Sequence, residues 1–294
     1  MGTAIRDFFT KGSAKPLRVL STMFDTDVLP VPTLFRSVKE MNRLEQVALN
    51  RAEGRVLDVG AGAGCHTLPL QERGLHVTAI DISPLSVETM QQRGVIDARQ
   101  EDFFAMAPDV TFDTILMLMN GTGIMGTLDN LPLLFDRLDV LLAPGGQLLV
   151  DSSDLRYVFE DEDGNFYPED FDNYYGEVDY QMVYGKVRGE RFNWLYVDFP
   201  RLQSCAELKG TAPNSFARAT TAITWRASSV SSAPQSEGGV PQSESSVSQS
   251  ESSALQSESH SPHPLSPHFL RRANKKTPHN FAILKNIPTF APQI

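Results

Sequence analysis

Short apolar runs alternate with longer amphipathic segments through the middle of the chain. The runs that predict strands lie at 56–59, 76–81, 112–117 and 147–150. Continuous runs of this length are typical of parallel strands, because both faces of such strands are covered. The segments that predict helices lie at 65–73, 84–93 and 130–142. Together they predict an α/β fold: a Rossmann-like, doubly wound, mainly parallel sheet with helices on both faces.

The segment before this core has a weaker pattern. The first twenty residues show little periodicity and predict a loose arm, taken as residues 1–31. Residues 32–52 carry apolar side chains at three- and four-residue intervals, which predicts one or two amphipathic helices. Phe35 and Arg36 are expected to pack against the sheet, with a place at a ligand mouth as the alternative.

Two segments after the core, 174–184 and 191–199, are rich in aromatic and β-branched residues. Glycines lie between them, so the pair predicts a β-hairpin. Tyr174, Tyr175 and Trp194 are candidates for covering an active site and selecting an aromatic or apolar ligand. Packing across the hairpin is the favoured alternative.

The pattern changes abruptly near residue 207. Gln-Ser-Glu recurs at 235, 242, 249 and 256 among Ser, Pro and Gly. This composition buries too little apolar surface to offset the entropy of ordering, so residues 208–294 are predicted to be a low-complexity tail, disordered over 228–268. Weak strand character at 219–225 is the exception. The abrupt change suggests a shifted reading frame or a fusion.

Charge divides the chain at about the same place. Residues 1–202 hold 18 basic and 31 acidic side chains, a net charge of −13, whereas 203–294 have a net charge of +3. Nucleic-acid binding depends on Lys and Arg that displace phosphate counterions. No nucleic-acid partner is therefore expected.

The chain shows no sign of membrane insertion, secretion or metal binding. It lacks an apolar run of eighteen residues and a signal-peptide pattern, which predicts a cytoplasmic protein without a membrane partner. Cys65 and Cys205 are far apart and have no metal-ligand spacing, so no metal site and no disulfide are expected.

The stretch 55–81 carries the clearest chemistry. Asp58, Gly60, Gly62 and Gly64 follow one another at alternate positions after the first strand. Glycines let the chain turn sharply and bring bare backbone against a ligand, and the following helix directs its free N–H groups toward a negative group. Asp81 ends the next strand, where its carboxylate can accept two hydrogen bonds from a ribose diol. This unit predicts an adenosine-containing cofactor.

The spacing distinguishes between two such cofactors. The dinucleotide fingerprint requires a third glycine where this chain has Cys65, so a match to NAD is imperfect. The run from Asp58 to Gly64, with Asp81, instead resembles class I S-adenosylmethionine-dependent methyltransferases. Segments 100–103, 112–117 and 141–150 resemble later motifs of that family, in order. The resemblance implies a domain at 32–207, with a cofactor core at 54–151 and an acidic loop and hairpin at 152–199.

The resemblance also implies which residues bind S-adenosyl-L-methionine. These are Asp58, Gly60, Ala61, Gly62, Gly64, Asp81, Ile82, Asp102, Phe103 and Met119. Ile82 and Phe103 are expected to sandwich the adenine, and Asp102 to accept a hydrogen bond from its amine. An ordinary loop carboxylate is the alternative for Asp102. His66 is expected to cap or pack rather than to react.

The sequence indicates less about the acceptor than about the cofactor. Asn120 is a candidate for holding cofactor or substrate, or only for making a turn, and Asp151 and Asp154 are candidate general bases. Residues 151–180 hold eleven acidic side chains and one basic side chain, which permits an amine-bearing acceptor. The expected activity is in-line methyl transfer to an unidentified small molecule. The alternatives are a catalytically inactive cofactor-binding protein and a nicotinamide-dependent oxidoreductase.

Overall fold

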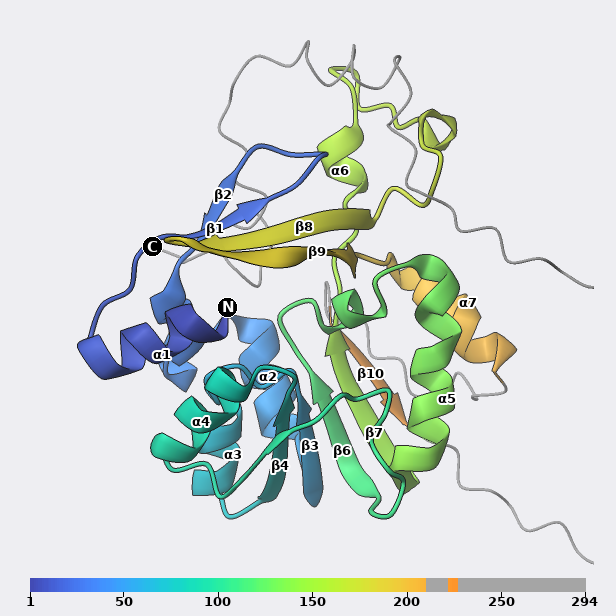
Figure 1. Ribbon diagram of the computed structural model, residues 1–294. Helices are drawn as coiled ribbons and strands as arrows, with labels where there is room; N and C mark the ends of the chain where they lie inside the picture. Colours follow the sequence, from blue (N-terminus) through green and yellow to red (C-terminus); the bar gives the residue numbers. More distant parts are fainter. Residues whose placement is uncertain (210–221, 227–294) are drawn as a thin grey trace, which may run out of the picture.

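The computed structural model describes residues 1–209 and the backbone of a strand at 222–226, and it contains two sheets (Figure 1). The larger sheet has six strands in the order β10-β7-β6-β3-β4-β5. Their bounds are β3 Arg55–Val59, β4 His76–Asp81, β5 Asp97–Gln100, β6 Phe112–Met117, β7 Leu142–Asp151 and β10 Ala222–Arg226. The first five are parallel and β10 is antiparallel to β7. The predicted Rossmann-like sheet is confirmed.

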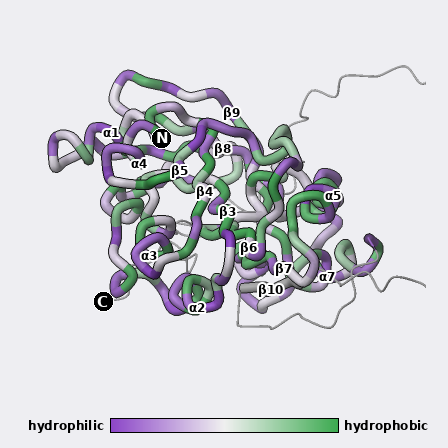
Figure 2. Tube along the Cα trace, turned by 90° about the horizontal axis from the view of Figure 1, so that it is seen from below, coloured by the Kyte–Doolittle hydropathy of each residue, from purple (hydrophilic) through white to green (hydrophobic). Residues whose placement is uncertain are grey.

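Helices cover both faces of this sheet. They are α2 Arg43–Arg51, α3 Thr67–Glu72, α4 Pro84–Gln92, α5 Leu131–Leu141 and α7 Phe199–Leu208. Successive strand residues point to opposite faces, so Leu57, Ile115 and Leu148 pack with α5 and α7. Their neighbours Val56, Leu116 and Leu149 pack with α2 and α3. The strands are therefore hydrophobic on both sides, as the green centre of Figure 2 shows.

Local signals set the helix limits. The Ser83 side chain accepts a hydrogen bond from Ser86 N and Pro84 follows at the first helical position, so α4 begins where the sequence predicts. Asp198 caps α7 in the same way, by accepting a hydrogen bond from Arg201 N. Each cap follows a strand closely, Ser83 after β4 and Asp198 after residue 195, and fixes where the chain turns into a helix.

The second sheet has four antiparallel strands in the order β2-β1-β8-β9. Their bounds are β1 Leu17–Leu20, β2 Asp27–Leu29, β8 Glu177–Tyr184 and β9 Val187–Leu195. The predicted hairpin is thus confirmed as β8 and β9. This sheet lies over the carboxyl ends of the parallel strands (Figure 1), where β9 packs against a 3-10 helix, η3 Gly121–Met125, that follows β6.

The prediction of a loose arm at the N-terminus is wrong. Residues 2–11 form a helix, α1 Gly2–Lys11, that packs against α4, and β1 and β2 complete the small sheet. Ile5 of α1 is fully buried beside Leu34 and Ala63. The sequence signal was weak because each of these elements is short and gains its stability from distant partners.

The amphipathic stretch at 32–52 is divided into three pieces rather than one or two helices. These are η1 Val31–Phe35, η2 Val38–Glu40 and α2. Two successive capping boxes, Ser37 with Glu40 and Asn42 with Glu45, each start a new helix and so interrupt a continuous one. Arg36 lies at the break after η1.

The predicted tail contains one described strand. Strand β10 pairs with β7 over residues 147–151, so the weak strand character at 219–225 is confirmed and the edge of β7 is covered. The disorder predicted for 228–268 lies outside the described residues.

Candidate active site

The glycine loop after β3 leaves open space beside its backbone. Gly60 and Gly62 have φ values of 70° and 59°, which favour glycine. A Cβ added at Gly60 would meet nothing within 4 Å, and one at Gly62 only the Gly60 carbonyl oxygen at 3.9 Å. A Cβ at Gly64 would instead lie 3.1 Å from Val95. Gly60 and Gly62 therefore present bare backbone, whereas Ala61 between them is buried in a cluster with Val87 and Met90, and Gly64 also serves packing against α4.

Asp81 lies at the end of β4, next to this loop. Its carboxylate accepts hydrogen bonds from Gly62 N at 2.9 Å and from Ser83 N at 2.8 Å. Burial raises the pKa of Asp81, against the lowering effect of these two N–H groups. These hydrogen bonds hold the Asp81 carboxylate at the carboxyl edge of the sheet. The glycine loop and Asp81 are expected to contact the same ligand there.

We expect ligand binding at Asp81 to weaken as the pH falls. A protonated carboxyl group accepts hydrogen bonds poorly, and the raised pKa of Asp81 means that protonation begins at a higher pH than for an ordinary aspartate. Titration calorimetry with an adenosine-containing ligand across the acidic range would measure this. An Asp81→Asn variant should lack the dependence, and an unchanged dependence would assign it to another group.

The three residues expected to contact adenine differ in their exposure to solvent. Ile82 is 74% exposed, whereas Phe103 is 3% exposed and belongs to the core around Leu57 and Ile80. Asp102 is exposed and accepts a hydrogen bond from Phe104 N at 3.0 Å, as a loop carboxylate does. Phe103 is therefore a core side chain, while Ile82 and Asp102 lie on the surface. Their roles toward an adenine ring remain predictions.

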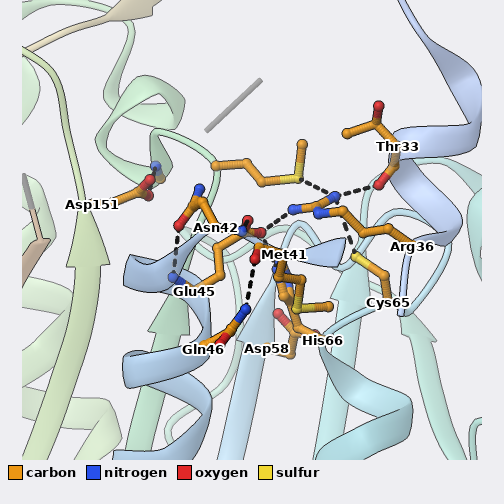
Figure 3. Close-up of polar contacts among 12 residues, drawn as sticks. Thr33, Arg36, Met41, Asn42, Glu45, Gln46, Asp58, Cys65, His66 and Asp151 are labelled. Carbon is orange, nitrogen blue, oxygen red and sulfur yellow. Dashed lines mark hydrogen bonds and ion pairs between the residues drawn. The ribbon is translucent and has the colours of Figure 1, made fainter. Parts of the chain in front are cut away.

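A buried polar cluster lies beside the glycine loop (Figure 3). Its members are Arg36, Glu45, Asp58, Cys65 and His66. The Glu45 carboxylate contacts the Arg36 guanidinium and lies 2.7 Å from His66 Nε2. Asp58 accepts a hydrogen bond from the Thr67 hydroxyl at 2.6 Å, and burial raises its pKa. His66 is thus a buried partner of Glu45, in agreement with its expected packing role.

Sequence reasoning missed Glu45 entirely. It is only 1% exposed, although it lies on a helix of mixed polarity. The sequence around it reads Asn42-x-x-Glu45, which is a capping box and predicts a surface role. Only the tertiary structure brings its carboxylate to Arg36 and His66.

The loop after β6 has a strained backbone. Met119 and Asn120 both have positive φ, 66° and 61°, which is uncommon outside glycine. Asn120 is fully buried: its side chain donates to Leu195 O at 3.1 Å and accepts from Ser153 N at 3.1 Å. Its backbone N–H donates to Asp151 Oδ1 at 2.8 Å. Asn120 therefore fixes the loop and, with it, the position of Met119.

Asp151 and Asp154 lie beyond β7 in different surroundings. Asp151 is 3% exposed and accepts hydrogen bonds from the backbone of the β6 loop. Asp154 is more exposed and accepts a hydrogen bond from the Tyr175 hydroxyl at 2.7 Å. The Tyr174 hydroxyl donates to Asp198 at 2.7 Å, and Trp194 packs beside Gly123. The structure therefore joins the acidic loop to the hairpin above the carboxyl edge of the sheet.

A surface hollow lies at the other end of the sheet. It is lined by the amino ends of β3 and β4 and by neighbouring turns, at Gly54, Arg55, Gly74, Leu75, His76, Thr111, Asp113 and Ala143. None of these residues belongs to the site described above. Within residues 1–209, no group of three or more His, Cys, Asp or Glu side chains is placed to hold a metal ion. Within the same range, no helix has the length and apolar character to span a membrane.

Comparison with known proteins agrees with this geometry. A family model described as a methyltransferase domain matches residues 35–197. A SAM-dependent methyltransferase from Bacteroides fragilis, solved in complex with S-adenosyl-L-homocysteine, is 50% identical; the match covers 77% of this chain and 94% of that one, with a TM-score of 0.72.

Curated relatives match over shorter stretches. A ubiquinone biosynthesis O-methyltransferase from Xylella fastidiosa is 32% identical over 33% of this chain and 41% of its own length. A cypemycin N-terminal methyltransferase from a Streptomyces species is 30% identical over 35% of this chain and 43% of its own length. The matches thus span less than half of these relatives, and the two names specify different acceptors.

Proposed function

This chain belongs to the S-adenosylmethionine-dependent methyltransferases, and from that membership we propose that it methylates a small-molecule acceptor at the carboxyl edge of the larger sheet. The observation that carries the proposal is the four-stranded sheet, which lies over this edge (Figure 1). We call this sheet the cover, because it would enclose an acceptor bound at that edge. Membership of the family also overturns the alternative of a nicotinamide-dependent oxidoreductase.

The residues at the edge fit the cofactor. Gly60 and Gly62 leave room along the backbone, and the Asp81 carboxylate lies beside them at the end of β4. In the proposed arrangement Asp81 holds the ribose diol, and the amino-acid end extends along the loop toward Asp58. The bound cofactor supplies a methyl group already activated on a sulfonium sulfur. The protein therefore needs mainly to align an acceptor with that methyl group and to exclude water.

The cover makes contacts that would limit the acceptor. Trp194 of β9 packs so closely on η3 that a Cβ added at Gly123 would lie 1.9 Å from its ring. Tyr180 of β8 is buried in one hydrophobic cluster with Tyr175 and Tyr196, which lie just outside the two strands. These contacts favour a small acceptor, aromatic or amine-bearing, over a polymer. Asp151 or Asp154 would receive any proton that the acceptor loses when it takes up the methyl group.

Methyl transfer to different classes of acceptor tests the proposal. The full chain is incubated with S-adenosyl-L-methionine and low-molecular-weight phenols, alcohols, amines and thiols, alongside a protein mixture and total RNA. We expect S-adenosylhomocysteine to form only with small acceptors. Transfer to protein or RNA alone would contradict the proposal. Tight S-adenosylhomocysteine binding without any transfer would instead support the inactive cofactor-binding alternative.

A further inference from the structure

One face of the cover carries a continuous aromatic surface. Tyr180 and Phe192 lie opposite each other in β8 and β9, and Trp194 shares their face because it lies two positions further along β9. Trp194 packs against η3, so this face is turned toward the carboxyl edge of the larger sheet (Figure 1). Tyr196 follows β9 on the same side. Neighbouring ring centroids among these four residues are 6.1, 6.3 and 6.5 Å apart.

Hydrogen bonds hold the chain after β9 on the loops of the carboxyl edge. Leu195 O accepts a hydrogen bond from Asn120 Nδ2 at 3.1 Å, and Val197 N donates to Ser152 Oγ at 3.0 Å. Leu195 and Val197 pack into the core around the larger sheet, so Tyr196 between them points the other way, into the cluster of the cover. Tyr196 is therefore fixed at the carboxyl edge, with its ring on the side of the cover.

The hydroxyl groups of Tyr180 and Tyr196 are buried and share one hydrogen bond. Their oxygen atoms are 3.0 Å apart, and the two residues are 7% and 1% exposed. Each hydroxyl has one hydrogen, and only one of the two hydrogens can lie between the oxygens. Among residues 1–209, neither hydroxyl makes a further hydrogen bond. Buried donors are seldom left unpaired, so the second hydrogen indicates a ligand atom that accepts it.

This hydroxyl pair is a neutral donor near the reacting edge. Burial, followed by the neighbouring Tyr180, raises the pKa of Tyr196 well above its usual value, and Asp151 at the end of β7 is close enough to add to the effect. Burial also raises the pKa of Tyr180 to about 12. Both hydroxyls therefore keep their protons near neutral pH, and the pair donates a hydrogen bond rather than acting as a base.

We propose that the acceptor is an aromatic molecule that carries an oxygen atom, bound against this face of the cover. Its ring packs on Phe192 and Trp194, which are only half-buried and can make offset or edge-to-face contacts. Its oxygen accepts the second hydrogen of the Tyr180–Tyr196 pair. This assignment rests on the proposed methyl transfer, and it narrows the acceptor from small molecules in general to phenols and related aryl oxygen compounds.

The test compares three ligands of similar size by titration calorimetry, with the full chain and S-adenosylhomocysteine. They are 2-naphthol, decahydro-2-naphthol, which has the oxygen but no aromatic ring, and 2-methylnaphthalene, which has the ring but no oxygen. The unaltered protein should bind 2-naphthol about 3- to 10-fold more tightly than either analogue. In a double variant, Tyr180→Phe with Tyr196→Phe, the preference over 2-methylnaphthalene should be lost, while the preference over decahydro-2-naphthol remains.

Tyr184→Phe is the matched control. Tyr184 is buried on the same strand, but its hydroxyl is paired: it donates to Asp7 at 2.9 Å and accepts from Lys15 N at 3.2 Å. Its replacement removes a buried hydroxyl from β8 without touching the Tyr180–Tyr196 pair. Both preferences should therefore be unaltered in this variant, and circular dichroism checks that the variants are folded.

Two results for binding would overturn the aromatic acceptor. One is that the unaltered protein binds 2-naphthol no more tightly than either analogue, or binds none of the three ligands, whether or not the variants fold. The other is that the double variant keeps the preference over 2-methylnaphthalene, which would leave the second hydrogen to a buried water molecule.

Methyl transfer from S-adenosyl-L-methionine to the two alcohols separates this assignment from the proposed function. Transfer to 2-naphthol with a KM about 3- to 10-fold lower than for decahydro-2-naphthol would support both. Transfer to both alcohols with the same KM would uphold methylation of small molecules and overturn the aromatic acceptor. Selective binding of 2-naphthol without transfer would uphold the binding surface and count against the proposed function.

Discussion

Replacement of Asp81 by alanine is expected to weaken S-adenosylhomocysteine binding by about 100-fold. The variant loses two hydrogen bonds from the ribose diol to a charged acceptor, each contributing about 1.5 kcal/mol. Their sum of about 3 kcal/mol corresponds to a hundredfold change in Kd. Titration calorimetry with S-adenosylhomocysteine measures the change directly.

Asp113→Ala is the matched control for this variant. Asp113 also accepts a backbone hydrogen bond, from Arg55 N at 2.7 Å, but it lies at the opposite edge of the sheet. Its replacement should leave the affinity unaltered. Asp81 also accepts hydrogen bonds from Gly62 N and Ser83 N, so its replacement removes internal contacts as well. Circular dichroism is therefore used to check that Asp81→Ala is folded. A folded Asp81→Ala that binds as tightly as Asp113→Ala would contradict the placement of the ribose.

Replacement of Glu45 by alanine is expected to lower the free energy of unfolding by about 3–5 kcal/mol. Glu45 is 1% exposed and is the shared partner of Arg36 and His66. Its removal leaves a buried guanidinium without its carboxylate, and breaking a buried pair from one side has this cost. Urea unfolding followed by circular dichroism measures the loss.

Glu40→Ala separates the buried pair from the capping box. Glu40 accepts hydrogen bonds from Ser37 N and Ser37 Oγ in the same motif, but on the surface. Its replacement should lower the unfolding free energy far less than Glu45→Ala does, because an exposed cap contributes little. Equal losses in the two variants would mean that Glu45 contributes as a helix cap alone.

The glycine loop and the acidic residues beside it could be located from the sequence because their signals are local. Asp58, the glycines and Asp81 lie within one strand-loop-helix-strand unit, where spacing along the chain determines position in space. The helix at 84–93 could be predicted for the same reason, since Ser83 and Pro84 form its start. These features need no knowledge of distant contacts.

The remainder depends on contacts between distant segments. Arg36, Glu45 and His66 come from three elements, and no spacing in the sequence indicates that they meet. The two capping boxes, at Ser37 and Asn42, are visible in the sequence. Each predicts the start of a new helix, so together they predict the division of the segment 32–52 that the structure shows. For Asn120, the sequence supported ligand binding and turn formation equally. Its hydrogen bonds to Leu195 and Ser153 show that it fixes the loop.

The pairing of β1 with β8 has a consequence for the order in which the chain is assembled. Leu17 lies opposite Tyr184, and the Tyr184 hydroxyl also accepts a hydrogen bond from Lys15 N, 169 positions away. During synthesis, β1 and β2 leave the ribosome long before β8 exists, so they must wait without their main partner. The parallel strands β3 to β7 can associate in that interval. We infer that the cover is completed only after the five parallel strands have been synthesised, which places its closure over the sheet late in folding.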